Sequence, residues 1–439
     1  MTHEFLIDIF KSAVDAVDPY NLILRKLNIK SGILKLFDEN ESFELDLNNF
    51  DKIIVIGIGK ASAKMALGVE NVFKGYDFEG LVVTKYGHTE KLTKFEVLQA
   101  GHPVPDENSI RGAEKIINLL KNVNDKTFVL TLVSGGGSAL VSAPREGFTL
   151  ADKQDITGKL LERGADIGEI NCVRKHLSRM KGGGYLKLLK DSFSLNLILS
   201  DVIGDRLDTI ASGLTYFDST TFHDALKICV KYNIEGKVKE YFKKGALGGA
   251  EETLKEKDIK SSRFKNVIIG SNYHALLGAK KKAKQLGLSP LILTDELFGE
   301  AREVAKVLLS FARGFKKYHK GYDCLISGGE TTVTIKGSGK GGRNQEMALA
   351  FLSELTKNDE GICFLSAGTD GNDGPTDAAG AMASYEILKR AYEVGLNPDD
   401  FLQNNDSYRF FEQVKALVKT GPTNTNVCDV QIVLLNSVT

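Results

Sequence analysis

The sequence predicts an α/β protein of two domains, built on parallel strands that end in glycine-rich loops. Short apolar runs such as 127–133 do not alternate strictly between polar and apolar residues, which is typical of strands buried on both faces of a parallel sheet. Helical patterns lie between these runs, and several runs end in loops rich in glycine. Open α/β sheets bind their ligands at the carboxyl ends of strands, so we expect the site in these loops.

Composition narrows the class of protein before any motif is considered. The chain has 439 residues, more than one ordinary hydrophobic core holds. Its 57 basic residues balance its 57 acidic ones, which argues against a nucleic-acid partner or a membrane surface. No apolar run approaches the roughly 20 residues that span a bilayer. The five cysteines form no C-x-x-C pair, and Cys324, Cys363 and Cys428 lie in or beside apolar runs, so we expect these three to be buried thiols, with a cytoplasmic location and no structural zinc.

The first half of the chain reads as alternating strands and helices. The apolar periodicity predicts helices over 3–27, from about 109 and over 149–167, and strands over 52–56, 80–85, 127–133 and 194–200. Lys60 follows the first of these strands in a glycine turn and precedes a helix. We favour a cation that faces the ligand over a solvated residue at a helix start. The dinucleotide fingerprint and the P-loop are both absent at this turn.

The central loop directly follows the apolar run 127–133. It consists of Ser134, Gly135, Gly136, Gly137 and Ser138. Glycine lets the backbone turn sharply and lets a ligand approach closely, and a helix beginning soon after would add free N–H groups that favour an anion. The alternative is a tight connection without a ligand. His102, in the proline-containing loop 101–106, is expected to be structural, with contact to a ligand as the alternative.

Charged residues follow the strand over 194–200 and precede a second glycine run. Asp201 and Asp205 could hold Mg²⁺, which prefers one or two carboxylates with phosphate oxygens and water, or they could cap turns. Lys175, Arg179 and Lys181 form a local basic cluster, either a solvated face or the lining of an anionic pocket.

The second half begins with a charged helical stretch, 218–262, which we interpret as a hinge. A second α/β unit is then predicted, with strands over 266–270, 290–294, 323–327 and 362–366 and helices over 272–286, 299–316 and 347–355. The strand over 323–327 is expected to end in a loop that contains Gly329 and Glu330.

Two polar loops in this half are candidates for ligand binding. The segment 337–346 contains four glycines and two cations and is followed by a helix, so we favour an anion site over a mobile surface loop. Arg343 could clamp phosphate oxygens in bidentate fashion, with Asn344 beside it, and the loop could close over them. Asp370 begins a segment, 370–377, with three aspartates that form turns or bind metal or substrate hydroxyls.

Seven short segments together resemble the glycerate 2-kinase family, the class with a C-terminal MOFRL domain. These segments are 57–61, 101–106, 134–139, 199–205, 327–332, 341–346 and 368–371, and they occur in the family's order. The resemblance implies a larger Rossmann-like parallel-sheet domain, expected over 1–240. It also implies a smaller C-terminal α/β domain over 241–439, with the MOFRL region at about 320–430 and an active-site cleft between the domains.

The resemblance further implies transfer of the ATP γ-phosphoryl group to the 2-hydroxyl of D-glycerate, with Mg²⁺ or another divalent cation. This reaction belongs to carbohydrate metabolism of the non-phosphorylative Entner–Doudoroff type. Catalytic roles fall to Lys60, Arg343 and Asp201, with Asp370 as a second candidate for the general base. Substrate or phosphate binding is expected at Ser134, Gly135, Gly136, Gly137, Ser138, Gly329, Glu330, Asn344 and Asp370, and metal binding at Asp201 and Asp205. A homodimer is expected from the family.

Two other functions remain open from the sequence. Some relatives in this family carry the label hydroxypyruvate reductase, an NAD(P)H-dependent oxidoreductase. Because the dinucleotide fingerprint is missing after Ile56, we favour the kinase hypothesis over the reductase hypothesis. A sugar-acid binding protein without catalysis is the third reading, and it would not require the loop that contains Arg343.

Overall fold

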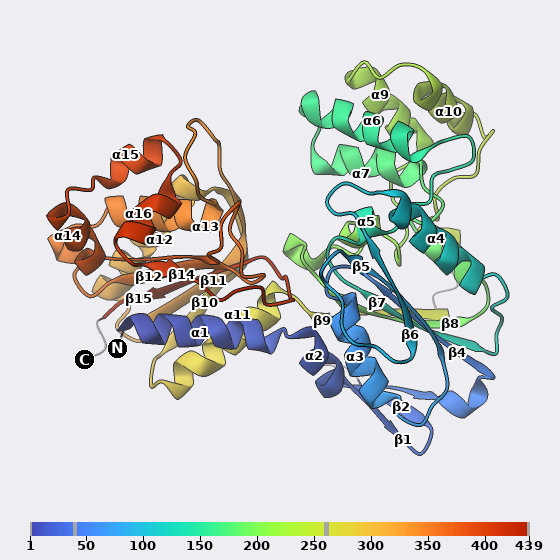
Figure 1. The fold of residues 1–439 in the computed structure, drawn as a ribbon, viewed down its shortest axis with the longest axis horizontal. Helices are drawn as coiled ribbons and strands as arrows, with labels where there is room; N and C mark the ends of the chain where they lie inside the picture. The colour runs from blue at the N-terminus through green and yellow to red at the C-terminus, as the bar shows by residue number, and fades with distance from the viewer. Residues whose placement is uncertain (1, 38–41, 259–262, 437–439) are drawn as a thin grey trace. The chain divides into compact units, whose positions relative to one another are not determined.

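The chain divides into two compact units (Figure 1). A computed structural model describes residues 2–37, 42–258 and 263–436. The parallel-sheet unit is Pro19–Ile269, and the mixed-sheet unit joins Met1–Asp18 to Gly270–Thr439. The first helix of the chain therefore folds with the C-terminal part, whereas the sequence placed it in an N-terminal domain that ends at residue 240.

The parallel-sheet unit contains a six-stranded sheet with the order β6-β5-β4-β7-β8-β9. Its strands are β4 (Lys52–Ile58), β5 (Glu79–Lys85), β6 (Phe95–Ala100), β7 (Thr127–Val133), β8 (Phe193–Leu199) and β9 (Phe264–Gly270). All four pairings from β6 to β8 are parallel. Every residue of β7 is buried, which confirms the prediction of a strand covered on both faces.

The strand predicted to open the second α/β unit belongs instead to this first sheet. β9 lies beside β8 at the edge of the sheet. The side-chain amide of Asn196 on β8 donates a 2.9 Å hydrogen bond to Asn266 on β9, and Asn266 in turn donates to the carbonyl of Thr215. These polar contacts across buried strands bind the segment to the first unit, which no local pattern in the sequence indicates.

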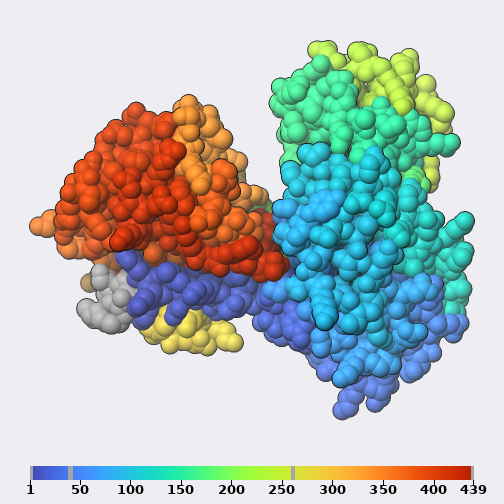
Figure 2. All heavy atoms as spheres, viewed as in Figure 1, coloured from blue at the N-terminus to red at the C-terminus, as the bar shows by residue number. Residues whose placement is uncertain are grey.

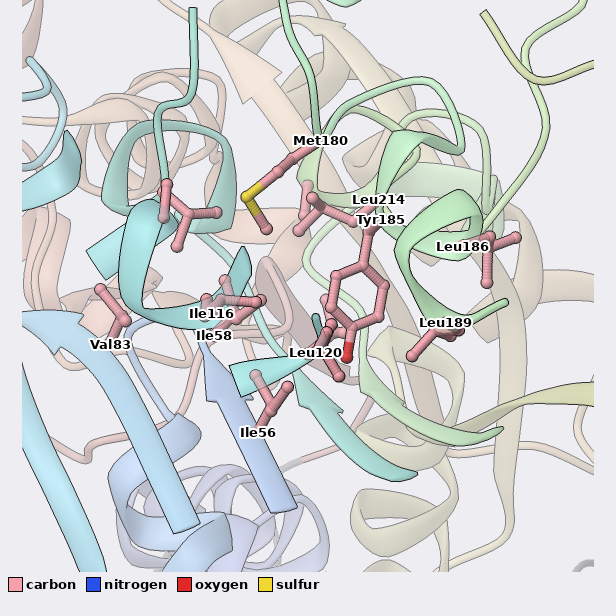
Figure 3. Close-up of a cluster of buried hydrophobic side chains, with 14 of the residues drawn as sticks. Ile56, Ile58, Val83, Ile116, Leu120, Met180, Tyr185, Leu186, Leu189 and Leu214 are labelled. Atoms are coloured by element: carbon pink, nitrogen blue, oxygen red, sulfur yellow. The ribbon is translucent and has the colours of Figure 1, made fainter. Parts of the chain in front are cut away.

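Helices cover both faces of this sheet. α3 (Ser62–Val72) contacts β4 and β5, while α4 (Glu107–Leu119) contacts β5 and β6. In the core cluster of Figure 3, Ile56 and Ile58 of β4 lie near Ile116 of α4 and Tyr185 of α8 (Gly184–Leu189). The alternate residues of β4 face the opposite side, since successive side chains in a strand point to opposite faces. A short antiparallel sheet, β1 (Leu27–Lys30), β2 (Ile33–Phe37) and β3 (Ser42–Asp46), completes the unit with α2 (Pro19–Lys26).

Four helices form a separate cluster in the same unit (Figure 1). They are α6 (Leu150–Glu162), α7 (Ile167–His176), α9 (Phe222–Lys231) and α10 (Lys237–Ala246). Phe222 and Phe242 are buried in their shared apolar core. Part of the segment predicted as a hinge, 218–262, is thus a packed element, because its apolar residues recur at helical spacing on one face of each helix.

The mixed-sheet unit holds a sheet with the order β10-β11-β15-β12-β13-β14. Its strands are β10 (Pro290–Glu300), β11 (Cys324–Thr332), β12 (Cys363–Gly368), β13 (Gly380–Ser384), β14 (Leu417–Val418) and β15 (Asp429–Leu434). β11 and β12 both pair antiparallel with β15, so both strands end at the edge where β15 begins. β11 also runs further than predicted, because residues 329–332 pair with the extended end of β10 instead of forming a loop.

Helices pack around this sheet as well. They are α1 (Thr2–Ala16), α11 (Asn272–Gln285), α12 (Ala301–Tyr318), α13 (Arg343–Ser353), α14 (Tyr385–Glu393), α15 (Pro398–Gln403) and α16 (Ser407–Gln413). α1 packs along α11, as the blue and yellow surfaces of Figure 2 show. The single helix predicted over 3–27 is therefore two helices in two units, separated at Pro19, a residue that cannot continue a helix from before it.

Two further findings concern the chain as a whole. All five cysteines are free and buried, as the sequence indicated for three of them. Among the helices of the described residues, none combines the length and apolar character needed to cross a bilayer.

The contact between α1 and α11 depends on Gly278. A Cβ at this position would lie 2.7 Å from the carbonyl of Ser12 and closer still to Ala16, whereas Gly314 in α12 has open space around it. We expect Gly278→Ala to lower the free energy of unfolding by about 1–3 kcal/mol through overpacking. Gly314→Ala should raise it by roughly 0.5–1 kcal/mol through helix propensity. Urea unfolding measures both, and a neutral or stabilising Gly278→Ala would contradict this packing.

Candidate active site

The carboxyl ends of β4 and β7 are locked together by two hydrogen bonds. The backbone N–H of Lys60 donates to the carbonyl of Gly135 over 2.9 Å, and the N–H of Ala61 donates to the Ser134 hydroxyl over 3.0 Å. Gly59, with φ of 131°, lies so close to Ser134 that a Cβ would collide with it. Ser134 therefore serves the turn itself, and the glycine is required by both its conformation and its close contact.

The glycine loop brings Lys60, Asp201 and His102 together. A Cβ on Gly135 would overlap the Asp201 carboxylate, which follows β8. A Cβ on Gly136, with φ of 84°, would lie 3.0 Å from His102 Nε2 and 3.1 Å from Lys60 Cγ. From the sequence we predicted that Lys60, Asp201 and the loop lie at one sheet edge, and the structure places them there. His102 was not predicted at this edge. The rule that X-Pro segments are extended cannot show which way the histidine faces.

The electrostatics of this group are set by burial. Burial raises the pKa of Asp201 above its usual range, and the positive charge of Lys60 opposes the rise. Burial, and next the charge of Lys60, lower the pKa of His102 to about 4. His102 is therefore neutral near pH 7, while the raised pKa gives Asp201 a stronger affinity for a proton than an exposed aspartate has.

The helix after the glycine loop is a single turn. α5 spans only Gly137–Leu140, one turn, so it is no extended helix aimed at an anion. The Ser138 hydroxyl lies 2.7 Å from the Ser212 hydroxyl. The Ser138 carbonyl accepts hydrogen bonds from Lys181, at 2.6 Å, and from Arg174, at 3.3 Å.

The predicted basic cluster separates in the structure. Lys175 is buried and pairs with Asp218 at 3.2 Å, and Arg179 is exposed and pairs with Glu114. Lys181 alone reaches the loop after β7. Residues that are close in sequence face different directions because they lie on α7 and the turn after it.

Arg343 organises the second group, at the edge where β15 begins. Its guanidinium forms a fork with Asp429, with Nε–Oδ2 at 2.6 Å and Nη2–Oδ1 at 3.0 Å, and its Nη1 lies 2.8 Å from Glu330 Oε1. Burial lowers the pKa of Arg343, but the charge and hydrogen bonds of Asp429 outweigh it and raise this pKa overall. The arginine is thus held by two carboxylates, one buried and one partly exposed.

Asp429 is the functional candidate that sequence reasoning missed. It is 1% exposed and stands directly before the apolar run that forms β15. Its register places it opposite both Gly329 of β11 and Gly368 of β12. One sequence feature could have indicated it: a single acidic residue at the start of an apolar run predicts a carboxylate at the edge of the sheet.

Asp373 occupies the start of α13. Its carboxylate accepts the backbone N–H groups of Asn344, at 3.1 Å, and Gln345, at 2.8 Å. The Asn344 side chain contacts Asp373 and also accepts from the Ser366 hydroxyl at 2.6 Å. These helix N–H groups, which the sequence offered to an anionic ligand, are thereby bonded within the protein.

The glycine-rich loop before α13 is held by the segment that joins α15 and α16. The Lys336 and Gly337 N–H groups donate to the Asn405 side chain at 2.8 and 3.0 Å, and Lys340 N–H donates to Asp406 at 2.8 Å. The sequence predicted a loop free to close over phosphates. The structure shows instead a loop whose backbone N–H groups from Lys336 to Lys340 are hydrogen-bonded to residues 404–406.

The three aspartates of 370–377 have three different environments. Asp370 accepts from the N–H of Asn372 at 3.0 Å in a turn, and Asp377 pairs with Lys419 at 2.9 Å. Asp373 caps α13, as described above. Asp370 is the partly exposed one that remains a candidate for contact with a ligand.

The carboxylates at these two groups could hold a magnesium ion only if phosphate oxygens and water completed its coordination. Within the described part of the chain no group of three His, Cys, Asp or Glu side chains is arranged to hold a metal. Mg²⁺ in nucleotide sites commonly uses one or two carboxylates with phosphate oxygens and water, so this donor set is sufficient. Asp201 has Lys60 nearby, whereas the Arg343 group carries more carboxylates than cations.

Comparison with known proteins agrees with this architecture. Residues 5–244 match a domain of unknown function, DUF4147, and residues 323–429 match the MOFRL family. The chain is 42% identical to the D-glycerate 2-kinase of Thermotoga maritima over 94% of its own length and 98% of that protein. It is 39% identical to the glycerate 2-kinase of Pyrococcus horikoshii, over 97% and 95% of the two chains.

Solved structures extend the likeness to three dimensions. The crystal structure of glycerate kinase from Thermotoga maritima aligns with a TM-score of 0.86 at 39% identity, covering 98% of this chain and 99% of that one. The fold is therefore that of a two-domain α/β phosphotransferase with a C-terminal MOFRL region. The chain belongs to the glycerate 2-kinase family.

The cap at α13 predicts a pH dependence of stability. Burial raises the pKa of Asp373 to about 6, so between about pH 4 and 6 the native carboxyl binds more protons than the unfolded one. Stability contributed by this group therefore falls as pH rises through that window. Relative to Asp373→Asn, the wild-type free energy of unfolding should drop by roughly 2–3 kcal/mol from pH 4 to 7. Urea titrations at several pH values measure the difference, and a flat difference would contradict the buried cap.

Proposed function

We propose that this protein is a D-glycerate 2-kinase. It transfers the γ-phosphoryl group of ATP to the 2-hydroxyl of D-glycerate and releases 2-phosphoglycerate and ADP. One observation carries the proposal: Lys60 and Asp201 meet at the glycine loop on the carboxyl edge of a parallel sheet, in a chain of this family. The names of the relatives from Thermotoga maritima and Pyrococcus horikoshii support the choice of substrate.

The chemistry needs charge neutralisation and one proton acceptor. Phosphoryl transfer asks little covalent chemistry of the protein, so positioning and electrostatics dominate. Lys60 neutralises charge on the transferring phosphoryl group. Asp201 takes the hydroxyl proton while the new O–P bond forms and the bond from phosphorus to the β-phosphate oxygen breaks. Its raised pKa favours this role, since a base works best near the ambient pH.

The proposal includes Mg²⁺, which when bound neutralises charge on the nucleotide phosphates. The sequence assigned the ion to Asp201 and Asp205. Lys60 makes the surroundings of Asp201 less favourable for a second cation, by like-charge repulsion. We therefore favour the partly exposed carboxylate of Glu330 as the ligand of the ion. Beside it, the negative charge of Asp429 offsets the positive charge of Arg343.

In this account Arg343 is a positioning residue. Its bidentate fork fixes Asp429, and its remaining Nη1 contact orients Glu330. A planar guanidinium can hold two carboxylates in this way, and a lysine ammonium cannot reproduce the fork. Glu330 is then available in a fixed orientation toward substrate or metal.

Location and assembly complete the proposal. We place the enzyme in the cytoplasm, which is supported by five buried free thiols that a reducing compartment preserves. We further propose a homodimer, as expected from the family. Size-exclusion chromatography with light scattering tests the assembly independently of activity.

The function is tested by two parallel assays, one for ADP formation and one for NADH oxidation. The protein is incubated with D-glycerate, ATP and Mg²⁺ while ADP is followed by ³¹P NMR, and separately with hydroxypyruvate and NADH while absorbance is recorded. We expect ADP and a phosphomonoester in equal amounts and no loss of NADH. Loss of NADH without ADP formation would make the protein a reductase and refute the kinase.

The assigned roles predict which substitutions matter. Lys60→Ala should lower kcat by 10²-fold or more because the transferring group loses its neutralising cation, while Lys74→Ala, at an exposed lysine just after α3, should not. Arg343→Lys should lower kcat at least tenfold, with Arg409→Lys, at an exposed arginine paired with Asp406, as its control. Steady-state kinetics with circular dichroism as a folding check measures both pairs. Normal turnover of either Lys60→Ala or Arg343→Lys refutes that residue's role.

A further inference from the structure

Two buried lysines and a partly exposed arginine lie together beside the glycine loop, with no acidic partner among the described residues. Lys153 of α6 and Lys181 are 6% and 2% exposed, and Arg174 of α7 is partly exposed. Among the described residues no carboxylate pairs with any of the three. Other buried cations of this unit do have acids, as Lys175 has Asp218. Burial of an unpaired charge carries a large free-energy cost, so this cluster requires an explanation.

The three cations converge on one turn of the chain. Lys181 Nζ and Arg174 Nη2 both donate to the Ser138 carbonyl, at 2.6 and 3.3 Å. Lys153 Nζ donates to the Ser142 hydroxyl at 3.2 Å. These bonds use only part of the donors that two ammonium groups and a guanidinium carry, which leaves several N–H groups for another acceptor.

The electrostatic state of the cluster agrees with this geometry. Burial, and next the charge of Arg174, lower the pKa of Lys153 to about 7. Burial, followed by the charges of Lys153 and Arg174, holds the pKa of Lys181 well below its usual range. Burial also lowers the pKa of Arg174. Burial and mutual repulsion therefore disfavour the charged forms of the two lysines as long as no counter-charge is bound.

The surrounding polar groups are of the kind that binds a hydroxylated anion. The Ser138 hydroxyl contacts the Ser212 hydroxyl, which in turn lies 3.2 Å from Asn171 Oδ1. Ser212 and the preceding Ala211 both have left-handed backbone conformations, with φ of 57° and 48°. Such strain in non-glycine residues collects at functional sites, because the surrounding structure must enforce it.

We propose that Lys153, Arg174 and Lys181 form an oxyanion-binding site next to the glycine loop. The inference deepens the proposed function and rests on it for its ligand, which is either the carboxylate of the acceptor or a phosphate of the nucleotide. Both offer oxygens that accept from ammonium and guanidinium groups. The anion supplies the counter-charge that the cluster lacks, and Arg174 is the member of the cluster that is partly exposed.

The test replaces a buried cation by an apolar side chain of similar shape. Lys153→Met removes the charge, and Lys159→Met on the same helix, at an exposed lysine paired with Asp155, is the matched control. Kd is measured by calorimetry for D-glycerate alone and for ADP alone, and Tm is measured with and without inorganic phosphate. Lys181→Met is the second variant should Lys153→Met not fold.

Two opposite changes are expected in Lys153→Met. Tm without ligand rises, because an unpaired buried charge has been removed, while Kd increases at least tenfold for one ligand. An increase for D-glycerate alone identifies the acceptor carboxylate, and an increase for ADP alone identifies a nucleotide phosphate. A lysine with a purely structural role would lower Tm and leave both Kd values unchanged, and that result overturns the site.

The outcome can be separated from the proposed kinase activity. Phosphate should raise the Tm of wild-type protein and of Lys159→Met, but not that of Lys153→Met. If wild-type protein makes no ADP from glycerate yet shows this phosphate pattern, the oxyanion site stands and the kinase proposal fails. If it makes ADP while phosphate and both ligands act equally on all variants, the site fails and the kinase stands.

Discussion

The candidate site of the parallel-sheet unit depends on how closely the ends of β4 and β7 approach. Two hydrogen bonds, from Lys60 N–H to Gly135 and from Ala61 N–H to Ser134, hold the turns at a separation that only glycines permit. That approach aims the Lys60 side chain along Gly136 and sets the Asp201 carboxylate against Gly135. Any side chain at these glycines would push the charged groups apart, so backbone packing decides where the chemistry can occur.

The two units differ in how some of their buried charges are balanced. In the mixed-sheet unit Arg343 is forked to the buried Asp429, and Asp373 accepts N–H groups at the start of the helix that Arg343 begins. In the parallel-sheet unit Lys153 and Lys181 are buried without acids. The paired charges fix the geometry of the site at a modest cost in free energy. The unpaired lysines carry a larger cost of burial, which a bound anion would reduce. A kinase needs both, since its substrates are anions that must be held in register.

Much of the fold and part of the site followed from sequence patterns with a local cause. Strand, glycine turn and helix in succession located Lys60, and the unbroken apolar run at 127–133 identified a strand buried on both faces. The helix predicted from residue 149 begins there, because the Thr149 side chain caps it by accepting the N–H of Asp152. Each of these features is determined by neighbours within a few residues, which is why reading the chain in order recovers them.

The features that were missed depend on contacts between distant residues. Asp429 meets Arg343 across 86 positions, and no motif marks a single acid ahead of an apolar run. Lys153 and Arg174 resemble ordinary solvated residues on amphipathic helices until α6 and α7 turn them inward beside Lys181. Pro19 was visible in the sequence, but that it separates helices of two different units required the tertiary structure.

The most direct test of the account is the position of the new phosphate on the product. The protein is incubated with D-glycerate, ATP and Mg²⁺, and the mixture is coupled to enolase alone, without phosphoglycerate mutase, while phosphoenolpyruvate is followed by its absorbance. Because enolase acts on 2-phosphoglycerate, the account predicts phosphoenolpyruvate in proportion to the ADP formed. The central claim would be contradicted if ADP formed without phosphoenolpyruvate and phosphoenolpyruvate appeared only after phosphoglycerate mutase was added. That result would show phosphorylation at the 3-hydroxyl.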